Sequence, residues 1–534
     1  MSFLRVENKK SGTYLRIVES YRDKNRVCQR TVYSLGKVED YAPSQLERIA
    51  KKLLELAGCR LEDIVKDDLK EIRRVNYGYA LVIKHLWKKL RLDEWMRKIN
   101  YKRRIRFDWL SSLELMISER LNDPCSKRSS FFHQTEYIGF GDSQIDLHHL
   151  YRTLDILSEE QSSLKKHLFT TQQSLFSSQL DVVFYDVTTL YFASEKEVES
   201  SIRQKGYSKD GKFHKTQVVL VLLVDKLRNP ISYHIYKGNT YEGKTMIEAL
   251  ESLRKDYNID KVIVVADSGM MNKDNLEFIE KQSSMDYIIG DRLRNLPEDV
   301  IDYLLSEENH KPLFSDSDDF TYSCLTYRNR RIICTYSEKR AIKDRNEREK
   351  LIAKAKKLLD NPSKLRHKNK TGTGRFIKQL SDEKFVLDIE KIILDERFDG
   401  YKAISTTSDL SIEEVLDRYG DLFEVEHTFR TLKSQLRIRP MFHWTDKRIE
   451  GHIAMCFIAY TMLNYLRLST GMQIKEIVNT LDEMQLSEIQ EGKVKETFFL
   501  RSSLSENQKK LINKLNIEIP RDVTSQHALN LLFK

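Results

Sequence analysis

The sequence predicts an α/β protein: a mixed five-stranded sheet with flanking helices, interrupted by a β-rich insertion and preceded by a small β-sheet and a helical domain. Three observations support this class. Residues 180–292 alternate apolar strand-like runs with amphipathic helical runs. Residues 295–395 break that alternation with short strand-like segments and a long charged helix. Residues 1–178 begin with period-2 patterning and then change to helical periodicity.

Length and composition limit the class of protein further. A chain of 534 residues suggests three or four domains, and a hydrophobic content of 40% is ample for folded cores. Lys and Arg number 90 against 80 Asp and Glu, so the net charge of +10 mildly favours an anionic partner. The six cysteines include no CxxC pair, which suggests neither a zinc site nor a disulfide framework.

The sequence contains no recognisable targeting segment. Residues 1–12 lack the apolar core of a signal peptide. The most apolar run, residues 453–463, is too short and too mixed to span a bilayer. We therefore expect a cytoplasmic protein with no membrane partner.

Residues 1–71 are predicted to form a small antiparallel sheet and a helix. Residues 3–38 alternate apolar and polar side chains around a turn at residues 23–25. A basic sheet face can bind phosphates or can simply be exposed to water, and the sequence leaves both interpretations open. The basic residues on this face are Arg16, Arg22, Arg26 and Arg30.

Residues 72–178 show helical periodicity, as in residues 107–121 and 146–157. Basic clusters lie between the helical segments, at residues 98–104 and 127–128. We interpret this region as a helical DNA-binding domain, although no helix-turn-helix spacing is recognisable.

The region after residue 179 contains the strands of the predicted sheet. Their order along the chain is β-β-β-α-β-α-β, with one aspartate within the first strand and another at the end of the fourth. This order is typical of the ribonuclease H-like fold. The strands are predicted at 181–192, 216–225, 231–238, 261–267 and 286–292, and the helices at 243–255 and 272–282.

The rest of the chain divides around this core. Residues 398–408 are predicted as a strand that returns to the main sheet, and residues 338–360 as a highly charged helix of the insertion. The predicted boundaries are 179–294 and 396–468 for the core, 295–395 for the β-rich insertion, and 469–534 for a C-terminal helical region.

Two aspartates of the predicted core are candidate ligands of a metal ion. Asp186 lies within a strand of aromatic and β-branched residues, where a carboxylate is costly unless it is neutralised. Asp267 ends a strand and precedes Ser-Gly. A structural interpretation also exists for each, because Asp186 can be an edge-strand residue or a lysine partner and Asp267 a turn or N-cap residue.

Residues 419–440 are predicted as one helix that ends at a proline. One of its faces is apolar. The side chains of the adjoining face lie within roughly 60° of each other around the helix axis. They form either a salt-bridge ladder exposed to water or a functional surface. These residues are Tyr419, Glu426, Arg430, Lys433 and Arg437.

Two strand carboxylates and one helix carboxylate can converge in this topology on two hard divalent cations. Mg²⁺ prefers few carboxylates together with water or phosphate oxygens. Two such ions can activate a water or a 3′-hydroxyl and stabilise the leaving oxygen of an in-line displacement. The candidate ligands are Asp186, Asp267 and Glu426.

The chain resembles the DDE transposases of bacterial insertion sequences, in the branch with a β-rich insertion between the second Asp and the Glu. That branch carries the signature Y-x2-R-x3-E-x6-K. Tyr419, Glu426 and Lys433 match it at the right spacing, whereas Leu422 occupies the Arg position. YDVTTLYF and VVADSGM resemble the motifs of the first and second Asp.

The resemblance implies Asp186, Asp267 and Glu426 as the catalytic and metal-binding triad. Helix geometry also favours Glu426 over Glu424, which would point about 160° away from the Tyr419 face. The expected cofactor is two Mg²⁺ ions, which Mn²⁺ is expected to replace.

The resemblance further implies double-stranded DNA as the partner, both as terminal inverted repeats and as target, and a homodimer on paired ends. DNA contacts are expected from Tyr419, Arg430, Lys433 and Arg437. Two other interpretations stay open. One is a catalytically silent DNA-binding inhibitor of transposition, and the other is a nuclease on the same fold without strand transfer.

Overall fold

The computed structural model of the chain divides into two compact units. The first comprises residues 1–74 and 487–500, and the second comprises residues 75–486 and 501–534. The residues that the structure describes are 2–9, 11–23, 26–56, 69–139, 145–176, 181–208, 211–257, 262–270, 272–282, 284–314, 317–360, 372–381, 384–491 and 497–533.

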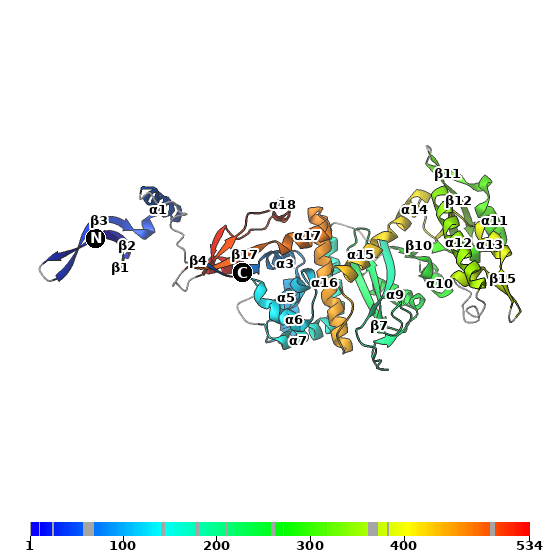
Figure 1. The fold of residues 1–534 in the computed structure, drawn as a ribbon, viewed down its shortest axis with the longest axis horizontal. Coiled ribbons are helices and arrows are strands. Elements are labelled where there is room, and N and C mark those ends of the chain that lie inside the picture. The colour runs from blue at the N-terminus through cyan, green and yellow to red at the C-terminus, as the bar shows by residue number, and fades with distance from the viewer. Residues whose placement is uncertain are drawn as a thin grey trace. The chain divides into compact units, whose positions relative to one another are not determined.

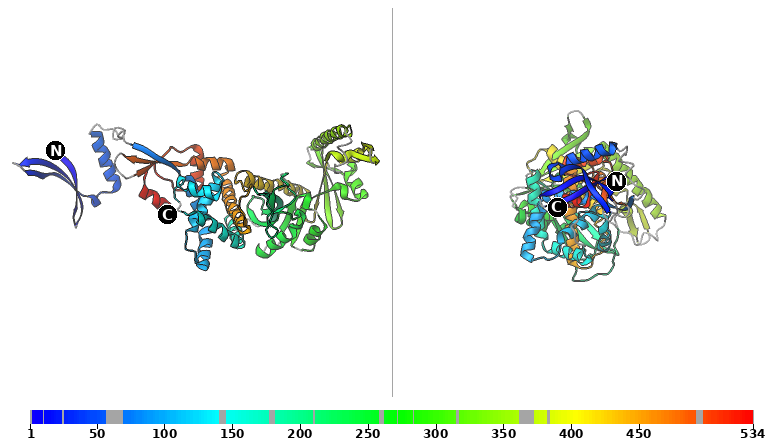
Figure 2. Two further views of the ribbon diagram at one scale, coloured as in Figure 1. Left: turned by 60° about the horizontal axis from the view of Figure 1, so that its bottom comes forward. Right: turned by 90° about the vertical axis from the view of Figure 1, so that its left-hand side faces the viewer.

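The first unit begins with the predicted antiparallel sheet, drawn in blue in Figure 2. On this sheet, Arg16 lies 3.4 Å from Glu7 and Arg30 lies 2.8 Å from Glu19. Ion pairing therefore accounts for two of the four arginines predicted on its basic face without any phosphate. Part of the predicted turn at 23–25 lies outside the described residues. The elements are β1 (Ser2–Lys9), β2 (Gly12–Asp23), β3 (Arg26–Lys37) and α1 (Pro43–Leu56).

The second unit is built on one large mixed sheet, of whose central strands Figure 1 labels β7 and β10. These central strands lie in the order β10-β9-β5-β7-β8. β5 pairs in parallel with β9 and antiparallel with β7. β9 pairs in parallel with β10, and β7 pairs antiparallel with β8. All five predicted strands are thus present. Their bounds are β5 (Val182–Tyr191), β7 (Thr216–Val224), β8 (Pro230–Lys237), β9 (Val262–Ala266) and β10 (Met285–Asp291), and a short β6 (Gln204–Lys205) also pairs with β7.

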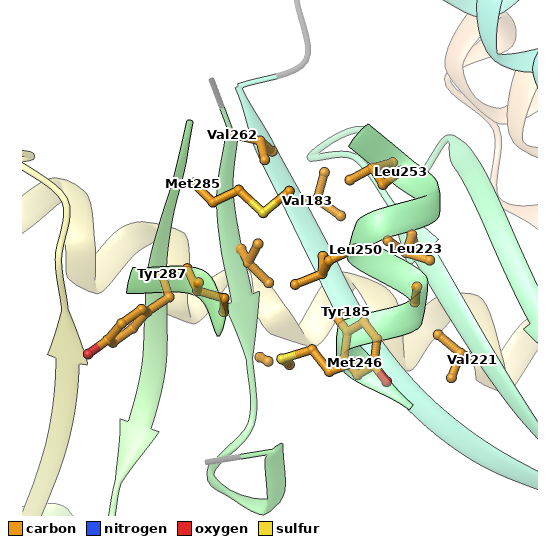
Figure 3. Packing of buried hydrophobic residues seen from close by; sticks show 14 of the residues in the cluster. Val183, Tyr185, Val221, Leu223, Met246, Leu250, Leu253, Val262, Met285 and Tyr287 are labelled. Atoms are coloured by element: carbon orange, nitrogen blue, oxygen red, sulfur yellow. The ribbon is translucent and has the colours of Figure 1, made fainter. Parts of the chain in front are cut away.

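One face of the central strands is covered by α9 (Met246–Tyr257), with α10 (Lys273–Glu280) beside it. Val183 and Tyr185 of β5 point into the same buried cluster as Leu250 of α9 (Figure 3). Side chains alternate along a strand, so the residue after Tyr185, an aspartate, faces the opposite side of the sheet. Burial of one face of β5 therefore sets the direction of that carboxylate.

Three strands of the insertion extend the main sheet, and two others pair with each other in a separate two-stranded sheet. β16 (Tyr401–Thr406) pairs antiparallel with β10 on one side and with β13 (Arg330–Ser337) on the other. The returning strand predicted at 398–408 is therefore present, and it joins the core to the insertion. The other elements of this region are α11 (Glu298–Leu305), β11 (Lys311–Phe314), β12 (Ser317–Tyr327), α12 (Glu338–Leu359), β14 (Ile377–Ser381), β15 (Lys384–Leu387) and α13 (Ile389–Glu396).

The helices of residues 75–176 belong to the same compact unit as the sheet. A long buried helix, α16 (Asp446–Thr470), packs against α5 and α7 of this region. α14 (Ile412–Gly420) packs against β10, and α15 (Leu422–Ser434) packs against β5 and β7. The remaining bounds are α3 (Gly78–Lys89), α4 (Leu92–Arg103), α5 (Trp109–Leu121), α6 (Lys127–His133), α7 (Leu147–Glu159) and α8 (Gln161–Phe176).

The C-terminal region differs from the helical region predicted at 469–534, because it also contains strands. One of them, β17 (Gln485–Glu491), pairs with β4 (Leu69–Asn76), a partner about 400 residues away that local periodicity cannot reveal. Among the described residues, no helix combines the length and the apolar character needed to cross a membrane. The other elements are α17 (Ile474–Asp482), β18 (Thr497–Arg501), α18 (Glu506–Leu515), β19 (Val523–Ser525) and α19 (Gln526–Leu532).

Candidate active site

Asp186 and Asp267 lie at matching positions along two neighbouring parallel strands. β5 and β9 are paired up to Phe184 and Val265, and each aspartate is two residues further along. Because side chains alternate with period two, both carboxylates leave the same face of the sheet. Asp186 is half-buried and Asp267 is exposed. In each aspartate, Oδ1 accepts a 2.7 Å hydrogen bond from the backbone amide of the next residue.

The single helix predicted at 419–440 is in fact two helices followed by an irregular segment. α14 ends at Gly420 and α15 begins at Leu422, so Tyr419 and Glu426 lie on different helices. Periodicity did not reveal this break because only one residue separates the two helices. The face predicted from a continuous helix therefore applies only within α15.

Arg437 does not share the helix face of Glu426, so its predicted alignment is wrong. α15 ends at Ser434, and Arg437 has a left-handed backbone with φ 41°. Its guanidinium lies 3.1 Å from the carboxylate of Asp123. A role of Arg437 in DNA binding stays a prediction.

A cavity of about 620 Å³ brings the three acidic candidates together with two of the basic ones. α15 contributes Glu426, Arg430 and Lys433, which lie one and two turns apart on the same helix. The sheet contributes the two aspartates. The residues that line the cavity are Asp186, Val187, Thr188, Asp267, Leu422, Glu426, Phe429, Arg430, Lys433, Ser434 and Arg439.

The neighbouring glutamate, Glu424, is directed elsewhere. Its carboxylate forms an ion pair with Arg228, and both side chains are about three-quarters buried, at 25% and 23% exposed. Glu426 is exposed and lines the cavity, while Val425 between the two glutamates is fully buried. The two glutamates therefore have different surroundings, as helix geometry predicts.

Tyr419 is buried, with 8% of its surface exposed, instead of being free to pack against DNA. The ammonium of Lys402 lies 4.3 Å from its ring centroid. Its hydroxyl lies against Gly290 of β10, where a Cβ would be only 2.4 Å from the oxygen. Burial raises the pKa of Tyr419 to about 12, so the phenol is neutral at physiological pH. Its position indicates packing between α14 and the sheet.

Two cations near the acidic residues were not identified from the sequence. Arg439 lines the same cavity, and Lys402 lines an adjacent cleft that also includes Asp267 and Tyr419. Burial lowers the pKa of Lys402, as does repulsion from Arg340, while Asp267 raises it. Only the basic character of the segment 437–439 was visible in the sequence.

The three carboxylates fit hard divalent cations in chemical type, because such ions prefer oxygen ligands. They are not among the groups of described residues whose ligand atoms all lie within 4.8 Å of one another. Two ions about 4 Å apart, each about 2 Å from its ligands, can be bound by oxygens that lie farther from one another than the ligands of a single ion. Two other groups in the described part of the chain do have all their potential metal-ligand atoms within 4.8 Å of one another. One consists of Glu119, Cys125 and His133, and the other consists of Asp146, His148 and His149.

Comparison with protein families supplies the identity of this region. Residues 177–462, more than half of the chain, match the sequence model of the family described as the transposase DDE domain. The chain belongs to the DDE transposase family. Residues 4–59 of the transposase also match the model described as the N-terminal domain of IS1634 family transposases. The protein is therefore an enzyme of DNA transposition, of a class that uses divalent metal ions.

Comparison with curated proteins found no match. Among solved structures, the transposase is similar to the piggyBac transposase in its synaptic complex with hairpin DNA. That likeness has a TM-score of 0.32 and 9% identity, and it covers 70% of this chain and 79% of the other. The Mos1 transposase in its paired-end complex with the left transposon end gives a TM-score of 0.15 and 11% identity, over 35% of this chain and 59% of the other.

Proposed function

We propose that this transposase cleaves the ends of an insertion sequence and joins them to target DNA by phosphoryl transfer that uses two divalent metal ions. One observation carries the proposal: a single cavity holds Asp186, Asp267 and Glu426 beside Arg430 and Lys433. The carboxylates supply the oxygen ligands of the ions, and the two basic side chains supply positive charge for DNA phosphates. This combination suits an anionic substrate that reacts with the help of divalent ions.

Each side chain has a distinct part in this chemistry. Asp186 and Asp267 provide carboxylate ligands for the metal ions from the sheet, and Glu426 provides a third carboxylate from α15. Arg430 and Lys433 bind phosphates that flank the cleaved bond. When bound, two Mg²⁺ ions lower the pKa of the attacking group and offset charge on the leaving oxygen, and Mn²⁺ is expected to substitute.

We assign the core to the ribonuclease H-like fold and the chain to the Y-x2-R-x3-E-x6-K branch. The central strand order, with one aspartate within β5 and another directly after the parallel strand β9, supports the fold assignment. Tyr419, Glu426 and Lys433 match the signature, and Tyr419 is buried. A contact of Tyr419 with DNA stays a prediction. Leu422 departs from the signature, and Arg430 on the same helix is the proposed substitute for the missing arginine.

The proposed partners are double-stranded terminal repeats and target DNA, bound by a homodimer on paired ends. Residues 1–178 are proposed to recognise the repeat beyond the cleavage point, and the insertion to hold DNA near the active site. Because this substrate is chromosomal DNA, the proposed location is the cytoplasm, at the nucleoid.

A cleavage assay tests this function directly. The DNA probe is a duplex that carries the inverted repeat bracketing the reading frame, incubated with the full-length protein and Mg²⁺. Cleavage at the repeat end followed by joining to a target plasmid is the expected result. Binding without cleavage would instead indicate a silent inhibitor, and cleavage without joining would indicate a nuclease.

A further inference from the structure

We propose that Glu119, Cys125 and His133 bind one Zn²⁺ ion, at a site separate from the catalytic cavity. The potential ligand atoms of these three residues all lie within 4.8 Å of one another. Oε2 of Glu119 lies 2.8 Å from Sγ of Cys125 and 3.1 Å from Nδ1 of His133. The residues that line the cavity around Asp186 are a different set.

The three residues come from three successive segments that the fold brings together. Glu119 is in the last turn of α5, Cys125 lies in the connection after it, and His133 is the last residue of α6. Their spacing, Glu-x5-Cys-x7-His, contains no CxxC pair, so the sequence suggested no zinc site. The turn between the two helices is what places the three side chains against one another.

The chemistry of these side chains suits zinc. Thiolate, imidazole and carboxylate groups are the ligands that Zn²⁺ binds in proteins, at about 2.3, 2.1 and 2.1 Å. Mg²⁺ prefers oxygen ligands and is disfavoured by a thiolate. On binding Zn²⁺, Cys125 loses its thiol proton to the solvent, because the thiolate is the form that binds a metal.

The distances are close to those of a zinc site. Tetrahedral geometry with these bond lengths separates neighbouring ligand atoms by about 3.3–3.6 Å. The separations of 2.8 and 3.1 Å from Glu119 Oε2 are shorter than this by less than about 1 Å. Small rotations of Cys125 and His133 away from Glu119 therefore open enough room for the ion.

The site has a buried base and an open side. Glu119 is 3% exposed, Cys125 is half-buried, and the side chain of His133 is 37% exposed. An ion can therefore enter beside His133, and water can supply a fourth ligand there. The ion, the carboxylate and the thiolate are neutral together, which lowers the cost of placing the ion in mostly buried surroundings.

Neighbouring polar groups orient the proposed ligands. The hydroxyl of Ser130 lies 3.4 Å from Sγ of Cys125. Gln134, directly after His133, accepts a 3.0 Å hydrogen bond from the amide of Ile145 and donates a 3.2 Å bond to its carbonyl. Contacts of this kind around a metal site hold its ligands in the orientation that the ion requires.

The second compact group of potential ligands gives a weaker argument. Asp146, His148 and His149 come from four consecutive positions, so their nearness follows from the sequence itself. Asp146 and His148 are also exposed, whereas the Glu119 group has a buried carboxylate at its base. The convergence of separate segments therefore favours the Glu119 group as the metal site.

Residues between the proposed ligands contact the segment that follows α15. Arg120, next to Glu119, donates from Nη1 to the carbonyls of Leu436 and Arg437 at 3.2 and 3.4 Å. The carboxylate of Asp123 lies 3.1 Å from the guanidinium of Arg437. Zinc bound at this corner would hold both contacts in place. The site is thus structural, and loss of the ion should lower the thermal stability of the protein.

The test uses untagged full-length protein without DNA, loaded with Zn²⁺ or Co²⁺ while excess Mg²⁺ occupies the acidic cavity. After gel filtration, mass spectrometry should find about one Zn²⁺ per chain. Co²⁺ in place of Zn²⁺ should give a sulfur-to-cobalt charge-transfer band in the near ultraviolet. The catalytic cavity has no cysteine among the described residues that line it, so this band does not report the acidic site.

Cys125→Ser and His133→Gln should each weaken Zn²⁺ binding by at least about 100-fold, measured by competition with a chromophoric chelator, because loss of an outer partner alone typically costs 10- to 100-fold. Cys125→Ser should also abolish the cobalt band. Cys324→Ser is the matched control, because Cys324 is likewise half-buried, and it should keep the wild-type band and affinity. A zinc-selective chelator should lower the thermal midpoint of wild-type protein and leave that of Cys125→Ser unchanged.

Two results would overturn the proposal. Wild-type protein that retains no Zn²⁺ and shows no cobalt band would leave only a hydrogen-bonded cluster, in which the thiol and the imidazole donate to Glu119. Full Zn²⁺ affinity in both Cys125→Ser and His133→Gln would place the ion elsewhere. The wild-type spectrum needs no variant, so it decides the first point even where a variant does not fold. None of these measurements involves DNA cleavage, so the outcome is independent of the proposed function.

Discussion

Glu424 and Glu426 are two residues apart on α15, and the structure predicts different consequences when each is replaced by glutamine. Glu426 lines the cavity with the two aspartates, where its negative charge is suited to a metal ion. Glu424 forms an ion pair with Arg228, away from that cavity. The substitution is nearly isosteric in both cases, so it tests charge at each position with little change in packing.

Glu426→Gln should lower the rate of Mg²⁺-dependent cleavage by about 10³-fold or more. Loss of several kcal/mol of transition-state stabilisation has this effect, because each 1.36 kcal/mol is tenfold in rate. Glu424→Gln should leave the cleavage rate within about threefold. Both partners of its ion pair are about three-quarters buried, so its loss should cost roughly 1–3 kcal/mol of stability, on the scale of a hydrogen bond to a charged group.

The assay pairs single-turnover cleavage of the terminal-repeat duplex with thermal unfolding of each variant. Glu424→Gln should unfold at a lower temperature, by roughly 2–4 °C for each kcal/mol lost. Glu426→Gln should unfold close to the wild-type temperature, because Glu426 is exposed. An inactive Glu424→Gln together with an active Glu426→Gln would refute the assignment of the triad.

Three further predictions follow from other parts of the chain. Lys433→Ala should weaken binding to DNA of any sequence and reduce the slope of log affinity against log salt by about one, and an unchanged slope with wild-type cleavage would leave Lys433 a member of a salt-bridge ladder. Lys127 is fully buried, and burial, with repulsion from Arg120, lowers its pKa from 10.5 to about 7. The unfolded state therefore binds more protons between pH 7 and 10.5, so this lysine makes stability rise with pH in that window. Lys127→Met should raise the thermal midpoint at pH 7, with a gain that shrinks toward pH 10.5, and a gain independent of pH would contradict this cause. Finally, light scattering should show a monomer or a weak dimer without DNA and a dimer with end DNA, and a stable dimer in the absence of DNA would overturn this order of assembly.

The sequence alone determined the strands of the core. Period-2 patterning and runs of β-branched residues follow from burial of one or both faces of a strand. Each buried position is therefore visible in the sequence as an apolar residue. All five strands around Asp186 and Asp267 were therefore predictable, as were the different directions of Glu424 and Glu426 on α15. Helical spacing is likewise a local property, so Arg430 and Lys433 were predicted to share a helix face with Glu426, and all three line one cavity.

Only the tertiary structure decided which residues outside these elements reach the site. The break between Gly420 and Leu422 separates Tyr419 from Glu426, and a one-residue break leaves almost no trace in periodicity. The course of the chain after Ser434 depends on Arg120, more than 300 residues away in sequence. The arginine that enters the cavity, and the one that turns toward Asp123, are thus selected by long-range contacts that no local pattern encodes.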